Sequence, residues 1–93
     1  MNSAGEFEAV ENAIGSRIRS RRNQLGLTQE EVASIAGIDR KHIGSIEAGK
    51  AEPGASTLFK IASALRIPVS ELVEGLVWVR NEHGIGHLMQ RIS

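Results

Sequence analysis

Three adjacent basic side chains, Arg40, Lys41 and His42, follow Asp39, a residue type that favours the position just before a helix. Arginine and lysine both donate hydrogen bonds to the O6 and N7 atoms of guanine, arginine as a planar fork and lysine as a point charge. Histidine can donate to a phosphate or a base, but an imidazole that only faces water explains His42 equally well. Basic side chains at a helix N-terminus oppose the helix dipole, so a purely structural role explains this run poorly.

Catalytic and metal-binding chemistry finds little support in the sequence. The chain has no cysteine, which excludes disulfides, thiolate metal sites and a cysteine nucleophile. His83 and His87 are spaced to share one face of a helix, but Gly84 and Gly86 adjoin them and no third ligand is evident beyond Glu82. No glycine-rich phosphate loop, Ser-His-Asp set or paired carboxylate appears. We expect no enzyme activity, no metal site and no cofactor.

Length and composition describe a small domain. Ninety-three residues with 41% hydrophobic content suit one core. No apolar run approaches the roughly 20 residues that span a bilayer, and the first residues are acidic where a signal peptide is basic. We therefore expect a soluble, cytoplasmic protein. Aromatic residues make up 3% of the chain, which argues against a stacking platform for single-stranded nucleic acid but leaves binding to duplex DNA open.

Signals for helix ends divide residues 14 to 75 into five helices. Gly26 closes the first helix after a basic turn. Thr28 and Glu31 form a capping box that starts the second helix, and Gly37 ends it. The chain should be nearly all helix.

The other three helices are predicted in the same way. Asp39 caps the third helix and Gly49 ends it. Ser56 is a candidate cap for the fourth helix, which Pro68 prevents from continuing. Ser70 then opens a short fifth helix.

Only residues 37–39 separate the second and third helices. Two helices joined by such a glycine-containing turn form a helix-turn-helix, whose second helix lies in the major groove with its first residues at base edges. Arg40 and Lys41 are the first two residues of that helix. We expect them to read bases in duplex DNA.

The charge distribution supports this interpretation. The formal net charge is zero, but residues 13–68 carry nine basic and five acidic side chains, whereas the two flanks together have a net charge of −4. Overall neutrality therefore hides a basic centre between acidic ends. The basic residues of the centre are Arg17, Arg19, Arg21, Arg22, Arg40, Lys41, Lys50, Lys60 and Arg66.

Residues 14–72 resemble the Cro/CI (XRE-type) helix-turn-helix family of phage repressors and bacterial regulators. The resemblance rests on R-I-R-x-x-R, G-L-T-Q-E-E, A-G-I, I-x-x-I-E-x-G-K and T-L-x-K-I-A-x-A-L in that order. Together these motifs are specific, where any one alone would be weak. The resemblance implies an all-α, five-helix, lambda-repressor-like domain, here with a short apolar C-terminal extension.

The resemblance also assigns the DNA contacts. The glutamine that opens the second helix contacts a phosphate in this family, and Gln29 occupies that position. The family's base-reading positions map onto Arg40, Lys41 and Ser45. Gly44, which faces the groove, departs from the family's usual larger side chain and would leave a gap at one base.

Further roles follow from the same resemblance. The family pairs an arginine late in the first helix with the glutamate that ends the recognition helix, and these are Arg22 and Glu47 here. This ion pair is expected to be structural. Lys50, Ser56 and Thr57 are expected to contact backbone phosphates.

The chain divides into an acidic arm with helix-forming signals at residues 1–13, the helix-turn-helix domain at 14–75, and a C-terminal tail at 76–93. The tail shows no convincing hairpin signal. It carries an apolar run and then a stripe with helical spacing, more apolar surface than five small helices need. We expect a dimer interface formed by Leu72, Leu76, Val77, Trp78, Val79, Ile85, Leu88, Met89 and Ile92. The alternative is a tail that folds back over its own domain, against Phe7 and Val10.

Two functions of different classes remain open at this point. The first is a sequence-specific repressor that binds a palindromic operator in double-stranded DNA as a homodimer. The second is an antitoxin or adaptor that uses the same fold and its apolar tail to bind a protein partner. The intact basic recognition helix favours the first.

Overall fold

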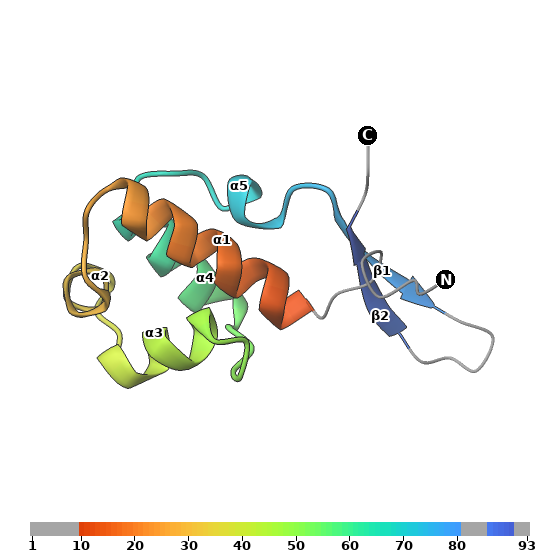
Figure 1. Cartoon of the computed structure of the whole chain (residues 1–93), viewed down its shortest axis with the longest axis horizontal. Coiled ribbons are helices and arrows are strands. Elements are labelled where there is room, and N and C mark those ends of the chain that lie inside the picture. Colours follow the sequence, from red (N-terminus) through yellow and green to blue (C-terminus); the bar gives the residue numbers. More distant parts are fainter. Residues whose placement is uncertain (1–9, 81–85, 91–93) are drawn as a thin grey trace.

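The computed structural model describes the backbone of residues 10–80 and 86–90, and the side chains of residues 10–77. Five helices pack together, and a two-stranded hairpin follows them at one end of the molecule (Figure 1). The predicted five-helix, lambda-repressor-like architecture is confirmed. The elements are α1 Val10–Gln24, α2 Gln29–Ala36, α3 Arg40–Glu47, α4 Ala55–Ala64, α5 Ser70–Val73, β1 Leu76–Arg80 and β2 Gly86–Gln90.

Helix α1 begins at Val10, earlier than the expected boundary between an arm and a domain at residues 13 and 14. Gly15 lies inside the helix, where a Cβ atom would overlap the carbonyl oxygen of Ile46 and lie 2.9 Å from that of Glu47. Glycine at this position therefore lets α1 and α3 approach closely. None of the helices in the described part of the chain, α1 included, is long and apolar enough to cross a membrane.

The predicted ends of α2 are confirmed. The Thr28 N–H donates to Glu31 Oε1 at 2.8 Å, and the Glu31 N–H donates to Thr28 Oγ1 at 3.0 Å, which completes the capping box. Gly37 ends the helix with a positive φ of 71°, and its N–H donates to the carbonyls of Ala33 and Ser34. These local signals fix α2 and the direction in which the chain leaves it.

Two of the predicted caps act differently from expectation. Asp39 occupies the N-cap position of α3, but its side chain makes no capping hydrogen bond. The expectation that Ser56 caps α4 is wrong, because the N-cap residue is Gly54 and Ser56 lies in the first turn. The Leu58 N–H donates to the Gly54 carbonyl at 2.9 Å, so helical hydrogen bonding has already started there.

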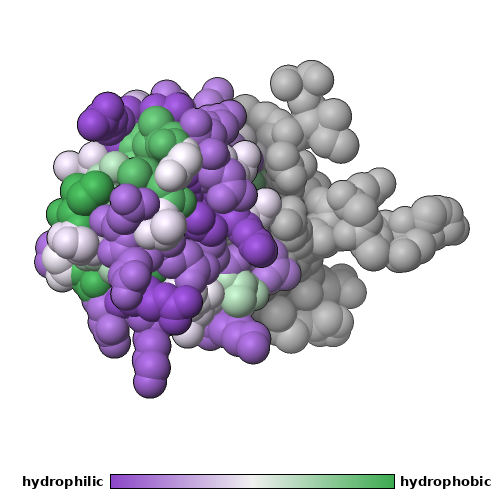
Figure 2. Space-filling view, turned by 60° about the vertical axis from the view of Figure 1, so that its left-hand side comes forward, coloured by the Kyte–Doolittle hydropathy of each residue, from purple (hydrophilic) through white to green (hydrophobic). Residues whose placement is uncertain are grey.

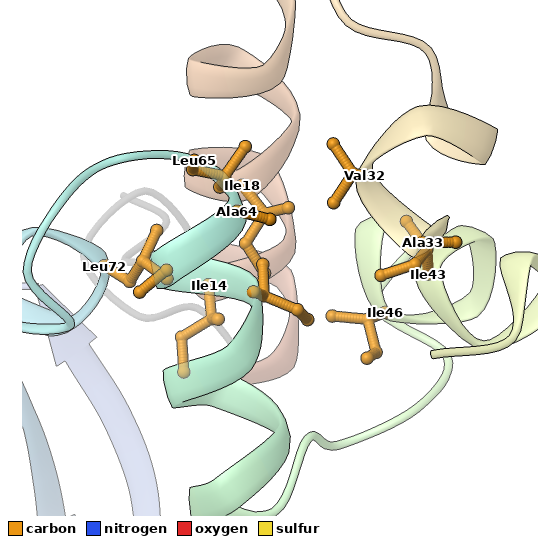
Figure 3. Packing of buried hydrophobic residues seen from close by; sticks show 11 residues of the cluster. Ile14, Ile18, Val32, Ala33, Ile43, Ile46, Ala64, Leu65 and Leu72 are labelled. Carbon is orange, nitrogen blue, oxygen red and sulfur yellow. The ribbon is translucent and has the colours of Figure 1, made fainter. Parts of the chain in front are cut away.

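One hydrophobic core joins all five helices. Helix α1 packs on α3 and α5, and α2 packs on α3 and α4. Figure 3 shows aliphatic side chains from these helices converging between them. Because α3 buries its apolar face in this core, its opposite face is turned outward in a fixed orientation. The core cluster is Ile14, Ile18, Val32, Ala33, Ile43, Ile46, Ile61, Ala62, Ala64, Leu65 and Leu72.

The C-terminal segment is a β-hairpin, for which the sequence offered no convincing signal. Strands β1 and β2 are antiparallel, with Trp78 opposite Leu88 and Val77 opposite Met89. The helical spacing of Leu88 and Met89 was misleading because short apolar runs do not distinguish strand from helix. The β-branched and aromatic residues of β1 favour the strand. Ile85 and Ile92, and Ser3 to Phe7 in the arm, lie outside the described residues.

Candidate nucleic-acid interface

Helix α3 presents a basic first turn to solvent. Ile43 and Ile46 bury one face of the helix, whereas Arg40 and Lys41 are exposed. The three-residue turn before the helix is held by the Ile38 N–H, which donates to the Ala33 carbonyl at 2.9 Å. The two cations therefore extend from a helix whose position is set by the core.

The other base-reading candidates lie one turn further along the same helix. Residues three and four apart are neighbours on a helix surface, so Gly44 adjoins Arg40 and Ser45 adjoins Lys41. Gly44, Ser45 and His42 are half-buried. Together these residues form the outer surface of α3 along its first two turns.

The predicted phosphate contacts lie on the elements around α3. Gln29 is the first residue of α2 and is half-buried. Lys50 is exposed in the loop after α3, where its backbone N–H donates to the Ser45 carbonyl at 2.9 Å. Ser56 is exposed and Thr57 half-buried in the first turn of α4.

Arg22 and Glu47 form a bidentate ion pair between α1 and α3. Arg22 Nε lies 2.6 Å from Glu47 Oε2, and Nη2 donates to Oε1 at 3.0 Å. A third N–H of the guanidinium donates to the Leu27 carbonyl at 2.8 Å. The side chains are 11% and 2% exposed, respectively, so water screens the pair very little. The loop between α1 and α2 is thus attached to the same guanidinium.

The pKa values of the two groups shift in the directions expected for a pair of charges. Burial alone would raise the pKa of Glu47, but hydrogen bonds from Arg22 and Gln29, with the charges of Arg22 and Arg19, outweigh it and lower that pKa. The hydrogen bond to Glu47 raises the pKa of Arg22 further above its already high value, against the effect of burial. Both groups are therefore ionised at neutral pH.

A link that the sequence did not predict joins α2 to this ion pair. Gln29 Nε2 donates to Glu47 Oε1 at 3.1 Å. The two residues are 18 positions apart and belong to different helices, so no helical or strand spacing in the sequence relates them. Glu47 therefore binds α1 through Arg22 and α2 through Gln29.

Two surface hollows are formed by described residues outside α3. A hollow of about 300 Å³ between α1 and α5 is lined by residues that include Arg17, Arg21 and Glu71. A smaller one is lined in part by Leu27 and Ile35, and Ile35 is 61% exposed. Figure 2 shows hydrophilic residues over most of one face, with hydrophobic residues gathered in patches. Neither hollow includes the outer surface of α3.

Among the side chains that the structure describes, no group of three could hold a metal ion. Of the two histidines with metal-ligand spacing, His87 belongs to β2, and His83 lies outside the described residues.

The predicted dimer-interface residues whose side chains the structure describes differ in burial. Leu72 is only 1% exposed because it packs in the core, so its proposed place in a dimer interface is wrong. Leu76 is half-buried and packs against the core, whereas Val77 is 37% exposed. Trp78, Val79, Leu88 and Met89 belong to the hairpin strands.

Comparisons with known proteins identify relatives of the domain. A sequence profile of the helix-turn-helix family HTH_3 matches residues 18–72, more than half of the chain. The control protein C.SmaI of Serratia marcescens is 36% identical over 80 residues, which cover 84% of this chain and 92% of that protein.

Two solved structures share the fold. The restriction-modification controller protein C.AhdI from Aeromonas hydrophila has a TM-score of 0.66 at 35% identity, covering 67% of this chain and 94% of that chain. The P22 c2 repressor, solved in complex with a synthetic operator, has a TM-score of 0.62 at 29% identity, with coverages of 67% and 94%.

We predict that Glu47→Ala lowers the free energy of unfolding by about 3 to 5 kcal/mol, because it leaves Arg22 buried without its partner. Chemical denaturation measures this loss. Glu52→Ala, at an exposed carboxylate in the loop before α4, is the matched control and should change stability by less than about 0.5 kcal/mol. Equal midpoints for the two variants would contradict a stabilising role of the pair.

The lowered pKa of Glu47 predicts an acid-sensitive contribution to stability. A carboxylate whose pKa is lower in the folded state stabilises that state fully above its unfolded value of about 4.3 and loses this effect as the pH falls towards the folded value. Between neutral pH and about pH 2, the free energy of unfolding of Glu47→Gln should therefore fall less than that of Glu52→Gln. Parallel stability curves for the two variants would show that Glu47 titrates alike in both states.

Proposed function

This chain belongs to the HTH_3 helix-turn-helix family, the Cro/CI (XRE-type) transcriptional regulators, and from that premise we propose a specific role. It binds double-stranded DNA in a sequence-specific manner and represses promoters by occupying a palindromic operator as a homodimer. The observation that carries the proposal is the pair of exposed cations, Arg40 and Lys41, on the face of α3 opposite the core.

The electrostatics of α3 support a negatively charged partner. Arg40 and Lys41 lie at the positive end of the helix dipole, and the first turn contains no acidic residue. This arrangement costs stability in the isolated domain, and a guanine edge or a nearby phosphate offsets that cost. Residues 13–68 also carry a net positive charge, which attracts the same kind of partner.

Base contacts and phosphate contacts divide among different residues. Arg40, Lys41 and Ser45 on α3 read bases, with His42 as a further contact. Side chains around α3 bind phosphates and fix the orientation of the helix on the duplex. These are Lys50, Ser56 and Thr57.

A dimer follows from the amount of DNA that one helix can read. A single recognition helix contacts only a few base pairs, and a two-fold dimer places two such helices roughly 34 Å apart, one turn of DNA. The hairpin is the candidate contact. An isolated two-stranded hairpin is marginally stable, and in the described part of the chain β1 and β2 pair only with each other. Pairing with a second copy would satisfy their outer edges.

We predict that Arg40→Ala relaxes selectivity at one base pair per half-site, at a cost of about 1 to 3 kcal/mol for the preferred sequence. Lys50→Ala should instead weaken binding to all sequences alike, because phosphates carry no sequence information. Competition between operators that differ at one base pair separates the two effects. Unchanged discrimination by the Arg40 variant would remove Arg40 from base reading.

We predict that Val77→Asp lowers the affinity of the dimer, because it puts a charge on an exposed apolar position of β1. Ile35→Asp changes an exposed aliphatic residue on α2 and should leave the dimer intact. Sedimentation measures both, and the emission of Trp78, the single tryptophan, should shift to the red as the wild-type chain is diluted. A wild-type monomer at high micromolar concentration would contradict the dimer.

A further inference from the structure

The side chain of Gln29 lies directly over Gly44 of the recognition helix. A Cβ atom at residue 44 would lie 3.5 Å from Gln29 Oε1 and 3.9 Å from Nε2. Both are ordinary van der Waals separations. The amide of Gln29 therefore lies beside the place where a side chain of α3 would begin, one helical turn after Arg40.

The Arg22–Glu47 ion pair fixes the orientation of this amide. An ionised carboxylate only accepts hydrogen bonds, so the nitrogen of the amide must face Glu47 Oε1, 3.1 Å away. The carbonyl oxygen is then the amide atom nearer to Gly44. Because Arg22 holds Glu47 with two hydrogen bonds, Gln29 has little freedom to turn.

The fixed amide retains a specific hydrogen-bonding pattern. A primary amide has two N–H donors and a carbonyl acceptor, and the bond to Glu47 uses one donor. One donor and one acceptor remain. In the major groove, adenine offers the complementary pair, the N7 acceptor and the N6 donor.

We propose that Gln29 reads a base edge, with adenine as the preferred base, through the space that Gly44 leaves on α3. The inference rests on the proposed function, since it assigns a further specificity-determining residue to the same DNA interface. A phosphate oxygen accepts hydrogen bonds but donates none, so a phosphate contact alone would leave the carbonyl of Gln29 unused. This base contact also requires Gly44, because a larger side chain at that position would cover the amide of Gln29.

The test compares the sequences that the wild-type chain and its variants select from a random duplex pool. Competition between duplexes that differ at one base pair then measures each preference. Gln29→Ala should abolish the preference for adenine at one position per half-site, where the wild-type chain discriminates by roughly 5- to 150-fold. Preferences at the other positions should persist.

Two further variants distinguish loss of the base contact made by the Gln29 amide from a general loss of DNA binding. Gly44→Leu keeps Gln29, Glu47 and Arg22 but places a larger side chain over the amide, and it should abolish the same single preference. It also carries the test if Gln29→Ala does not fold, as judged by circular dichroism. Gln24→Ala, at an exposed glutamine at the end of α1, should leave every preference unchanged.

Each result has one interpretation. Equal weakening of all sequences by Gln29→Ala would reduce Gln29 to a phosphate contact and overturn the inference, as would an unchanged preference in both Gln29→Ala and Gly44→Leu. In either case the proposed function stands, since the wild-type chain still selects an operator. A wild-type chain that selects no sequence would overturn the proposed function as well.

Discussion

The ion pair between Arg22 and Glu47 connects the parts of the domain that matter for DNA binding. Glu47 is the last residue of α3, where the helix dipole disfavours a negative charge, and its side chain is almost wholly buried. It is ionised because Arg22 donates two hydrogen bonds and Gln29 a third. One carboxylate thereby joins α1, α2 and α3. Gly15 permits this by letting α1 approach the end of α3.

This ion pair matters more for the orientation of the side chains around it than for the stability of the domain. Well-packed apolar side chains of similar volume often replace a buried ion pair at no loss of stability, whereas removal of one partner is costly. An apolar replacement would still pack α1 against α3, but it would not orient the amide of Gln29. The hydrogen bonds of Glu47 are directional, so they orient the Gln29 side chain at the surface of α3 relative to the helices of the core.

The sequence allowed prediction where the determining forces are local. Thr28 and Glu31 specify the start of α2 through hydrogen bonds within one turn, and the family resemblance located α3 and its exposed cations. The hairpin was missed because Leu88 and Met89 fit a helical period and strand pairing is a non-local property. The same limit applies to Gln29: its position over Gly44 depends on how two helices pack, and no motif within either helix encodes that.

A chain with no net charge must bind DNA through the arrangement of its charges. The four excess cations of residues 13–68 are balanced by acidic flanks. Of the flanking acidic residues that the structure describes, Glu11 lies in the first turn of α1, and Glu71 and Glu74 lie in α5 and at its C-terminal end, which packs on α1. Long-range attraction to phosphates, which supplies most non-specific affinity, is consequently weaker than the basic centre alone would give. In the proposed function, the free energy that selects an operator then comes largely from short-range contacts on α3 and its neighbours. Such contacts depend on geometry. Side chains held in a fixed orientation at this surface therefore contribute more to DNA recognition than the overall charge of the chain does.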